Sequence, residues 1–253
     1  MGTVVTMDLY LLEDYDRDTV QLRIDRAVAD LHEVDNVFST WQPTSAISRV
    51  RCGALDLAAA PAVLIEVLAA CASIREASWG WFDPWAMPGG VDPSGYVKGW
   101  AAQRAAMLLD GPATSGVLVN AAGDVFVLGA PTTATSFRVG VVNPFSPNTL
   151  ALVVEVDAAV ATSGTYERGD HLIDPGSGAP RADVASATVT GPDAGVADAL
   201  ATALAVGGTS VLPAIDELDN YEGLTIGHDG VVAHTPGFPL AGRPPRDQGS
   251  RTL

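Results

Sequence analysis

The texture of the chain changes near Gly116, and this change limits the possible folds more than any other feature of the sequence. Before it, long segments carry apolar residues near helical spacing. After it, short apolar runs such as VFVLG, FRVGVV and LALVVEV are separated by Gly, Pro, Asn and Asp, as strands are by turns. Strand and helix do not alternate as they do in a parallel sheet. We therefore predict an α+β fold with packed helices and mostly antiparallel sheets.

The spacing of apolar and capping residues predicts a strand at 4–12 and three helices in the first half, at 18–37, at 61–78 and from 99 onward. One more helix is predicted in the second half, at 196–206. Residues 38–50 read as a loop. The final segment, 236–253, is rich in Pro, Gly and Arg, which is typical of a poorly ordered tail. We therefore expect a single domain over 1–235, followed by this tail. A division of that domain into two subdomains is the alternative.

The charge balance is strongly acidic, with 30 Asp and Glu against 14 Lys and Arg and a formal net charge of −16. A field of this sign repels DNA and RNA, so we expect no nucleic-acid partner. No apolar run reaches the ~20 residues that span a bilayer. The N-terminal segment turns acidic where a signal peptide would be basic and then apolar. The chain as given is thus expected to be cytoplasmic without a membrane span, or exported if a leader was removed.

A Gly-rich segment, 91–100, carries Lys98, the only lysine of the chain. A carboxylate at Asp92, small residues and this cation just before a helix favour a phosphate and metal site, because backbone N–H groups and a helix N-terminus attract anions. The same residues also fit an ordinary turn with one solvated lysine. Their spacing matches neither a Walker A loop nor a dinucleotide fingerprint.

Two further groups of polar residues are candidates for chemistry. Asp198 and Thr202 are four residues apart in a predicted helix, so they share one face and suit a hard cation such as Mg²⁺. The alternative is a carboxylate that supports the helix dipole and a threonine that is simply packed. His171, between Asp170 and Asp174 in a Gly-rich loop, is a candidate base, although a single histidine is more often structural.

Eight segments, taken in order, resemble the motifs of the ApbE family of FAD:protein FMN transferases, and they span nearly the whole chain. They read MGT, FSTWQPTSAISRV, WFDP, VDPSGYVKG, NAAGD, ATSGTYER, HLIDPGSG and ADALATAL. Each segment alone is a weak signal, but eight in the same order identify the family. The resemblance implies an ApbE-like, T-fold-like α+β domain.

The resemblance also implies an activity and a site. The activity is Mg²⁺-dependent cleavage of the pyrophosphate of FAD, with transfer of FMN to a Thr or Ser hydroxyl of a client flavoprotein and release of AMP. Carried over by position, the flavin-binding residues are Met1, Trp41, Trp81, Phe82, Asp83, Asp92, Lys98 and Ile173. The implied metal ligands are Asp198, Thr202 and the backbone oxygen of Gly95. Our hypothesis for the base that activates the client hydroxyl is His171, oriented by Asp174.

The sequence departs from the family pattern in places. Ala122 stands where the family more often has glycine, Pro93 and Ser94 replace Leu-Gly after Asp92, and Ala201 replaces a carboxylate that some members carry. Two alternatives to the transferase remain open. One is a Mg²⁺-dependent FAD pyrophosphatase, in which water replaces the client hydroxyl and the products are FMN and AMP. The other is a non-catalytic FAD-binding protein, which leaves FAD whole.

Overall fold

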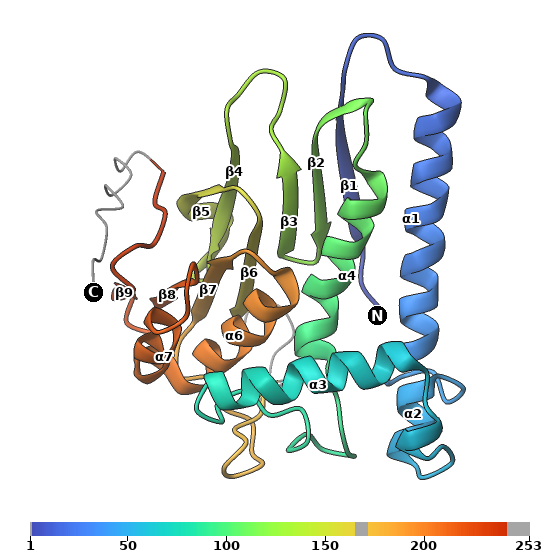
Figure 1. The fold of residues 1–253 in the computed structure, drawn as a ribbon. Coiled ribbons are helices and arrows are strands. Elements are labelled where there is room, and N and C mark those ends of the chain that lie inside the picture. The colour runs from blue at the N-terminus through green and yellow to red at the C-terminus, as the bar shows by residue number, and fades with distance from the viewer. Residues whose placement is uncertain (1, 165–171, 242–253) are drawn as a thin grey trace, which may run out of the picture.

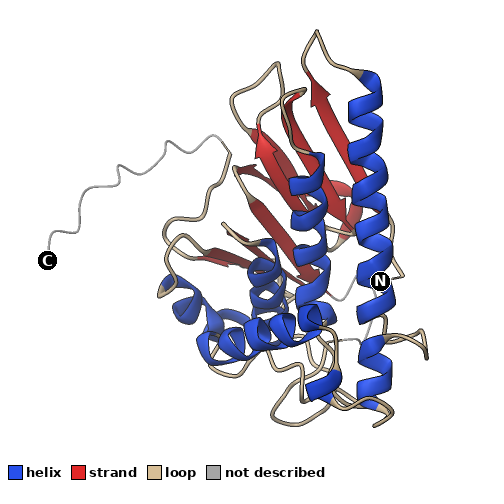
Figure 2. Cartoon of the chain, turned by 45° about the vertical axis from the view of Figure 1, so that its right-hand side comes forward, coloured by secondary structure: helices blue, strands red, loops and turns tan. Residues whose placement is uncertain are grey.

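The computed structural model describes residues 2–164 and 172–241. In this part of the chain a seven-stranded antiparallel sheet has the order β1-β2-β3-β6-β7-β8-β9, and helices cover one of its faces (Figures 1 and 2). The strands of this sheet are β1 (Val5–Leu11), β2 (Thr114–Ala121), β3 (Asp124–Gly129), β6 (Ala159–Gly164), β7 (Ser186–Gly191), β8 (Glu222–Ile226) and β9 (Val232–His234). A separate antiparallel pair consists of β4 (Phe137–Asn143) and β5 (Ser146–Val156). The predicted α+β class is confirmed.

The helices belong mainly to the first half of the chain and to one segment between β7 and β8. They are α1 (Arg17–Phe38), α2 (Ala46–Arg51), α3 (Ala62–Ala77), α4 (Ser94–Leu109), α6 (Ala194–Gly207) and α7 (Leu212–Asp216), with short 3₁₀ turns η1 (Leu57–Ala59) and η2 (Gly208–Val211). Side-chain caps fix the starts of α1 and α6. The carboxylate of Asp16 accepts from the backbone N–H groups of Asp18 and Thr19, and that of Asp193 accepts from Val196 N at 2.9 Å.

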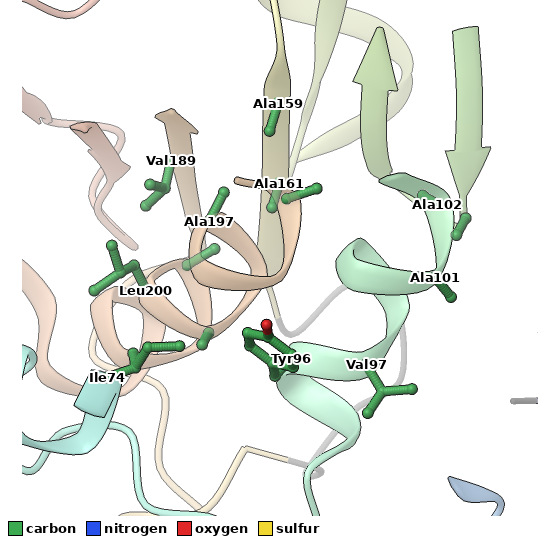
Figure 3. Close-up of a cluster of buried hydrophobic side chains, with 14 of the residues drawn as sticks. Ile74, Tyr96, Val97, Ala101, Ala102, Ala159, Ala161, Val189, Ala197 and Leu200 are labelled. Atoms are coloured by element: carbon green, nitrogen blue, oxygen red, sulfur yellow. The ribbon is translucent and has the colours of Figure 1, made fainter. Parts of the chain in front are cut away.

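The main core lies between the sheet and the small side chains of α4 and α6. Figure 3 shows residues of α4, such as Tyr96 and Ala101, and of α6, such as Ala197 and Leu200, near Ala161 of β6. Alanines at this interface let the two helices approach both each other and the sheet. This close approach places the first turns of α4 beside Asp198 and Thr202 of α6.

The opposite face of the sheet is covered by β4 and β5. Buried side chains of β3, such as Val125 and Val127, meet those of β4 and β5 there, together with Phe238, which is 2% exposed. Residues beyond β9 pair with the edge of β5, since Glu155 N donates to Pro239 O at 3.1 Å and Ala241 N to Val153 O at 2.9 Å. Residues 236–241, which were assigned to the tail from the sequence, are thus packed against β5, and Phe238 completes this second core.

Two elements differ from the sequence-based prediction. The predicted loop 38–50 contains α2, which begins where the Ser45 hydroxyl accepts from Ser48 N at 3.1 Å. Helix α4 begins at Ser94 rather than near Gly99, so Gly95 and Lys98 lie inside the helix and not in a loop before it. Pro93 explains the early start, because its fixed φ suits a helix N-terminus.

One helical stretch, Ala194–Asp216, is long and apolar enough to cross a membrane by length and composition alone. However, 72% of its most apolar window is buried inside the protein. Such burial is the pattern of a core helix, and α6 indeed packs against β6 and β7.

Candidate active site

A recess opens where the segment after α3, the start of α4, the end of β6 and the segment after residue 171 meet. The lining combines flat rings and aliphatic groups with carboxylates, hydroxyls and one ammonium group: Trp81, Phe82, Asp83, Pro84, Met87, Asp92, Ser94, Gly95, Lys98, Ala122, Thr162, Ser163, Leu172, Ile173 and Thr202.

The recess brings together most of the residues predicted for the flavin and the metal. The predicted residues in its lining are Trp81, Phe82, Asp83, Asp92, Gly95, Lys98, Ile173 and Thr202. Trp41 is not in the lining, and its side chain is 87% exposed after α1. Met1 and His171 lie outside the described residues. The lining also contains Met87, Ser163 and Leu172, which were not predicted as site residues; the latter two belong to segments that resemble family motifs.

At the base of the recess, Lys98 joins the buried carboxylates of Asp124 and Asp198, which do not themselves lie in the lining. Its Nζ lies 2.9 Å from Asp198 Oδ1 and also contacts Asp124 Oδ2, and these two carboxylate side chains are 0% and 1% exposed. Burial alone would lower the pKa of Lys98, but attraction to Asp124 and Asp198 outweighs it and raises that pKa above its ordinary value. Lys98 is therefore charged at neutral pH. Asp124 was missed as a site residue because its motif, NAAGD, reads by itself as a simple turn.

Asp198 is held from α4 rather than being turned toward open space. Its Oδ2 accepts from Gly99 N at 3.2 Å, while its Oδ1 accepts from Lys98. A carboxylate oxygen has more than one lone pair, so these bonds leave capacity for a further partner.

Thr202 lies one helical turn after Asp198 and meets the first turn of α4. A Cβ added to Gly95 would lie 3.0 Å from Thr202 Oγ1 and 3.4 Å from the Phe82 ring, so glycine permits this close contact. The Thr202 hydroxyl is also 3.5 Å from Ser163 Oγ. The oxygen atoms of a carboxylate, a hydroxyl and a main-chain carbonyl thus come from neighbouring parts of α4 and α6.

These oxygen donors fit Mg²⁺. They do not fit a metal that needs several His, Cys or carboxylate ligands. Within the described ranges there is no group of three or more His, Cys, Asp or Glu side chains that could hold a metal ion. Ala201, just before Thr202, is fully buried and offers no side-chain ligand. Mg²⁺ commonly binds proteins through one or two carboxylates and keeps its remaining sites for water and substrate phosphates. Asp198, Thr202 and Gly95 are compatible with that role.

Asp92 is fixed by an arginine that also holds the loop before α4. Its side chain pairs with Arg51 Nη1 at 3.3 Å, and its Oδ1 accepts from Ser94 N at 3.0 Å. Arg51 donates in addition to Pro88 O at 2.9 Å and to Val91 O at 3.3 Å. The loop that forms one side of the recess is therefore tied to α2.

Asp83 is held from the end of α3. Its side chain pairs with Arg75 Nε at 2.7 Å, and its Oδ1 accepts from Trp85 N at 2.9 Å. Both of the acidic residues that line the recess, Asp83 and Asp92, are thus paired with arginines. This pairing reduces the repulsion that an anionic ligand would meet.

Asp174 is engaged within its own turn. Its carboxylate accepts from Gly176 N at 2.9 Å and from Ser177 Oγ at 3.0 Å, and it lies 3.5 Å from Arg181 Nη1. The hydrogen bonds from Gly176 and Ser177 lower the pKa of Asp174, with a smaller effect from Arg181. The carboxylate is therefore ionised at neutral pH. His171, which it was predicted to orient, lies outside the described residues.

The turn between β2 and β3 closes another side of the recess. Ala122 has φ of 53° and Gly123 has φ of 97°, so both residues take the left-handed conformation. Asn120 Oδ1 accepts from Gly123 N at 2.8 Å and stabilises the turn. The turn is therefore formed with alanine where the family more often has glycine, at the cost of backbone strain.

Solved structures that carry the name ApbE have the same architecture. The flavin transferase ApbE from Vibrio cholerae aligns with a TM-score of 0.78 and 20% identity over 93% of this chain and 94% of that one. The ApbE protein from Thermotoga maritima aligns with a TM-score of 0.78 and 21% identity over 93% and 94% of the two chains. At these identities the likeness establishes a shared fold, so the chain has the fold of the ApbE-type flavin transferases.

The sequence comparison then identifies the family. The sequence pattern of the ApbE family matches residues 1–90 and 87–224. The chain therefore belongs to the ApbE family.

Two curated relatives carry the name FAD:protein FMN transferase. The protein from Treponema pallidum (strain Nichols) is 36% identical over 132 residues, which are 45% of this chain and 36% of that protein. The protein from Rhodobacter capsulatus is 32% identical over 156 residues, which are 58% of this chain and 30% of that protein. The match thus spans about a third of the length of these relatives.

Proposed function

We propose that this chain is a Mg²⁺-dependent FAD:protein FMN transferase that modifies a Thr or Ser hydroxyl of a client flavoprotein. The observation that carries the proposal is the convergence of six of the eight family-like segments on one recess and the lysine–carboxylate cluster at its base. The names of the curated relatives support the same activity. FAD is then the substrate, and FMN-bearing client and AMP are the products.

The proposed reaction breaks the phosphoanhydride bond of FAD and forms a phosphoester bond to the client. The client hydroxyl oxygen forms a bond to the phosphorus on the riboflavin side of the FAD pyrophosphate. The bond from that phosphorus to the bridging oxygen breaks, and AMP leaves with that oxygen. The proton of the client hydroxyl passes to a base, for which His171 is our proposal. No covalent intermediate with the enzyme is needed, so positioning and charge carry most of the catalysis.

The residues of the recess divide these tasks. Lys98, held charged by Asp124 and Asp198, places a positive group where the pyrophosphate would lie. The rings of Trp81 and Phe82 offer flat apolar surface for the isoalloxazine or the adenine and keep water away from it. The pairing of Asp83 and Asp92 with arginines limits their repulsion of the diphosphate.

Asp198, Thr202 and the Gly95 carbonyl are the groups that would hold Mg²⁺. When bound there, the ion would neutralise charge on the pyrophosphate and on the departing AMP. The close position of Gly95 against Thr202 supports this assignment.

The test is to incubate the protein with FAD and Mg²⁺, with and without a flavoprotein domain that bears an acceptor threonine. The intact mass of the client is measured beside free FMN and AMP. We expect a client heavier by one FMN. We expect transfer to fall by at least about a hundredfold in Asp198→Asn, the scale of losing one major charge-stabilising group. Asp216→Asn, an exposed carboxylate on α7, is the matched control and should retain full transfer.

Other outcomes would reject the transferase. Free FMN and AMP beside an unmodified client would favour the pyrophosphatase. FAD that remains whole would favour a binding protein. Because Asp198→Asn disturbs a buried ion pair, Thr202→Val serves as a second variant that removes a proposed ligand without changing any charge.

A further inference from the structure

Trp81, which lines the recess, follows two residues of unusual backbone conformation. After α3 the chain passes through two successive residues with positive φ, Trp79 at 54° and Gly80 at 84°. The Trp81 indole then packs against the end of α6, where a Cβ added to Gly207 would lie 2.6 Å from Trp81 Cδ2. Glycine at this position leaves room for the ring, and the indole forms a wall of the recess.

Arg181 covers the same indole from another segment of the chain. Its guanidinium carbon lies 5.3 Å from the centroid of the Trp81 ring, within the range of a cation–π interaction. Two carboxylates hold the guanidinium in place: Asp183 Oδ1 at 3.2 Å and Asp174 Oδ2 at 3.5 Å. A planar guanidinium can meet a ring and two carboxylates together, which an ammonium group does less well.

Arg181 also belongs to the segment that forms a second wall of the recess. Its N–H donates to Leu172 O at 2.9 Å, and Ile173 pairs with Pro180 in an antiparallel bridge. Leu172 and Ile173 both line the recess. Asp183, for its part, is fixed to α6, because its N–H donates to Ala205 O at 2.9 Å. Arg181 therefore links the Trp81 wall to the wall formed by Leu172 and Ile173.

From these contacts we infer that Arg181 is a positioning residue that acts through Trp81: it fixes the indole as the surface on which a flat ring of the flavin nucleotide packs. The inference rests on the proposed function for the identity of the nucleotide. Arg181 itself is not in the lining of the recess, so its effect on the ligand is transmitted by the ring it covers. Its removal should weaken FAD binding only while the indole is present.

The experiment is a double-mutant cycle that uses the binding of FAD in the presence of Mg²⁺ and without client. Quenching of flavin fluorescence gives the dissociation constant for the wild type, Arg181→Gln, Trp81→Leu and the double variant. We expect Arg181→Gln to weaken binding about fivefold in the Trp81 background, a factor typical of a cation–π contact. In the Trp81→Leu background the same change should have an effect of less than about twofold, because the two residues act as a unit.

Two further variants keep the test sound. Arg138→Gln removes an exposed arginine that pairs with Glu155 on β5, and it should leave FAD binding unchanged. If Arg181→Gln fails to fold, Asp183→Asn loosens the same guanidinium without removing it, and its effect should likewise vanish in the Trp81→Leu background. An equal factor in both backgrounds would overturn the inference, because it would mean that Arg181 acts on the ligand directly.

The cycle separates this inference from the proposed function. A wild type that transfers FMN to a client, but shows equal factors in both backgrounds, rejects the role of Arg181 alone. A wild type that binds FAD and shows the coupling, but never modifies a client, rejects the transferase and retains the role of Arg181. A wild type that does not bind FAD overturns both.

Discussion

Lys98 Nζ lies 2.9 Å from Asp198 Oδ1, and this ion pair joins α4 to α6 at the base of the recess. The same ammonium group contacts Asp124 on β3, so the only lysine of the chain holds two buried carboxylates from two other elements. The pair therefore belongs both to the core and to the proposed metal site. A change at Lys98 is expected to affect stability and activity together.

The first prediction concerns the stability that depends on Lys98. In Lys98→Met two carboxylates stay buried without their cation, and we expect the free energy of unfolding to fall by about 3–5 kcal/mol. Urea unfolding followed by circular dichroism measures this loss. Arg138→Met is the control: it removes an exposed pair with Glu155 and should cost no more than about 1 kcal/mol. Similar losses in the two variants would contradict the structural role of Lys98.

Two glycines on α4 give a second prediction, because their surroundings differ. A Cβ added at Gly99 would lie 2.0 Å from the Ala194 carbonyl oxygen, so Gly99→Ala must force α4 and α6 apart. We expect a loss of at least about 2 kcal/mol in unfolding free energy, as for other overpacked cores. Urea unfolding of the wild type and of Gly99→Ala measures this loss.

Gly95→Ala is the matched variant one turn earlier. Its nearest neighbour is the Thr202 hydroxyl at 3.0 Å, and the better helix propensity of alanine offsets the crowding by about 1 kcal/mol. We therefore expect nearly unchanged stability but weaker Mg²⁺-dependent activity, because the Thr202 hydroxyl is displaced. A Gly95→Ala variant with full activity would argue against Thr202 as a ligand.

The sequence predicted the architecture well because its strongest patterns are local. The helical spacing of apolar residues in α1, and the Gly, Pro, Asn and Asp residues between the strands of the second half, are local signals. The candidate site residues were predicted from resemblance to a family, and eight of them line one recess. A motif predicts that its residues belong to the same site, but it does not predict which of their atoms are in contact.

The sequence did not predict contacts between distant residues. The bonds from Lys98 and from Gly99 N to Asp198 join positions about a hundred residues apart, which no local pattern records. Arg181 was not predicted at all, because its partner Trp81 is equally remote in sequence. The early start of α4 had a local signal, Pro93, but the two glycines that follow it favoured a loop.

The third prediction uses the strain at Ala122. Its φ of 53° costs an L-residue roughly 1–2 kcal/mol, which glycine avoids at a smaller entropic cost. Ala122→Gly should therefore raise the free energy of unfolding by about 0.5 kcal/mol. Ala134→Gly, in an exposed loop without positive φ, is the control and should lower it slightly. A loss of stability in Ala122→Gly would mean that contacts of the methyl group outweigh the strain.

The last prediction concerns alkaline pH and Tyr221. Burial, with a further effect of the Asp193 carboxylate, raises the pKa of Tyr221 to about 12. In the unfolded chain a tyrosine loses its proton near pH 10. Between these values the unfolded state binds fewer protons than the folded state, so the free energy of unfolding must fall as pH rises. Below pH 10 both states keep the proton, and this contribution to stability is fully present.

Tyr221→Phe removes one source of that fall. We expect urea unfolding at intervals between pH 9 and pH 12 to give a shallower decline for the variant than for the wild type, and a constant difference below pH 10. The decline does not vanish, because burial also raises the pKa of Tyr96. Tyr15→Phe is the control, since this ring is 44% exposed and its hydroxyl meets water in both states. Parallel curves for wild type and Tyr221→Phe above pH 10 would show that the Tyr221 hydroxyl titrates alike in both states.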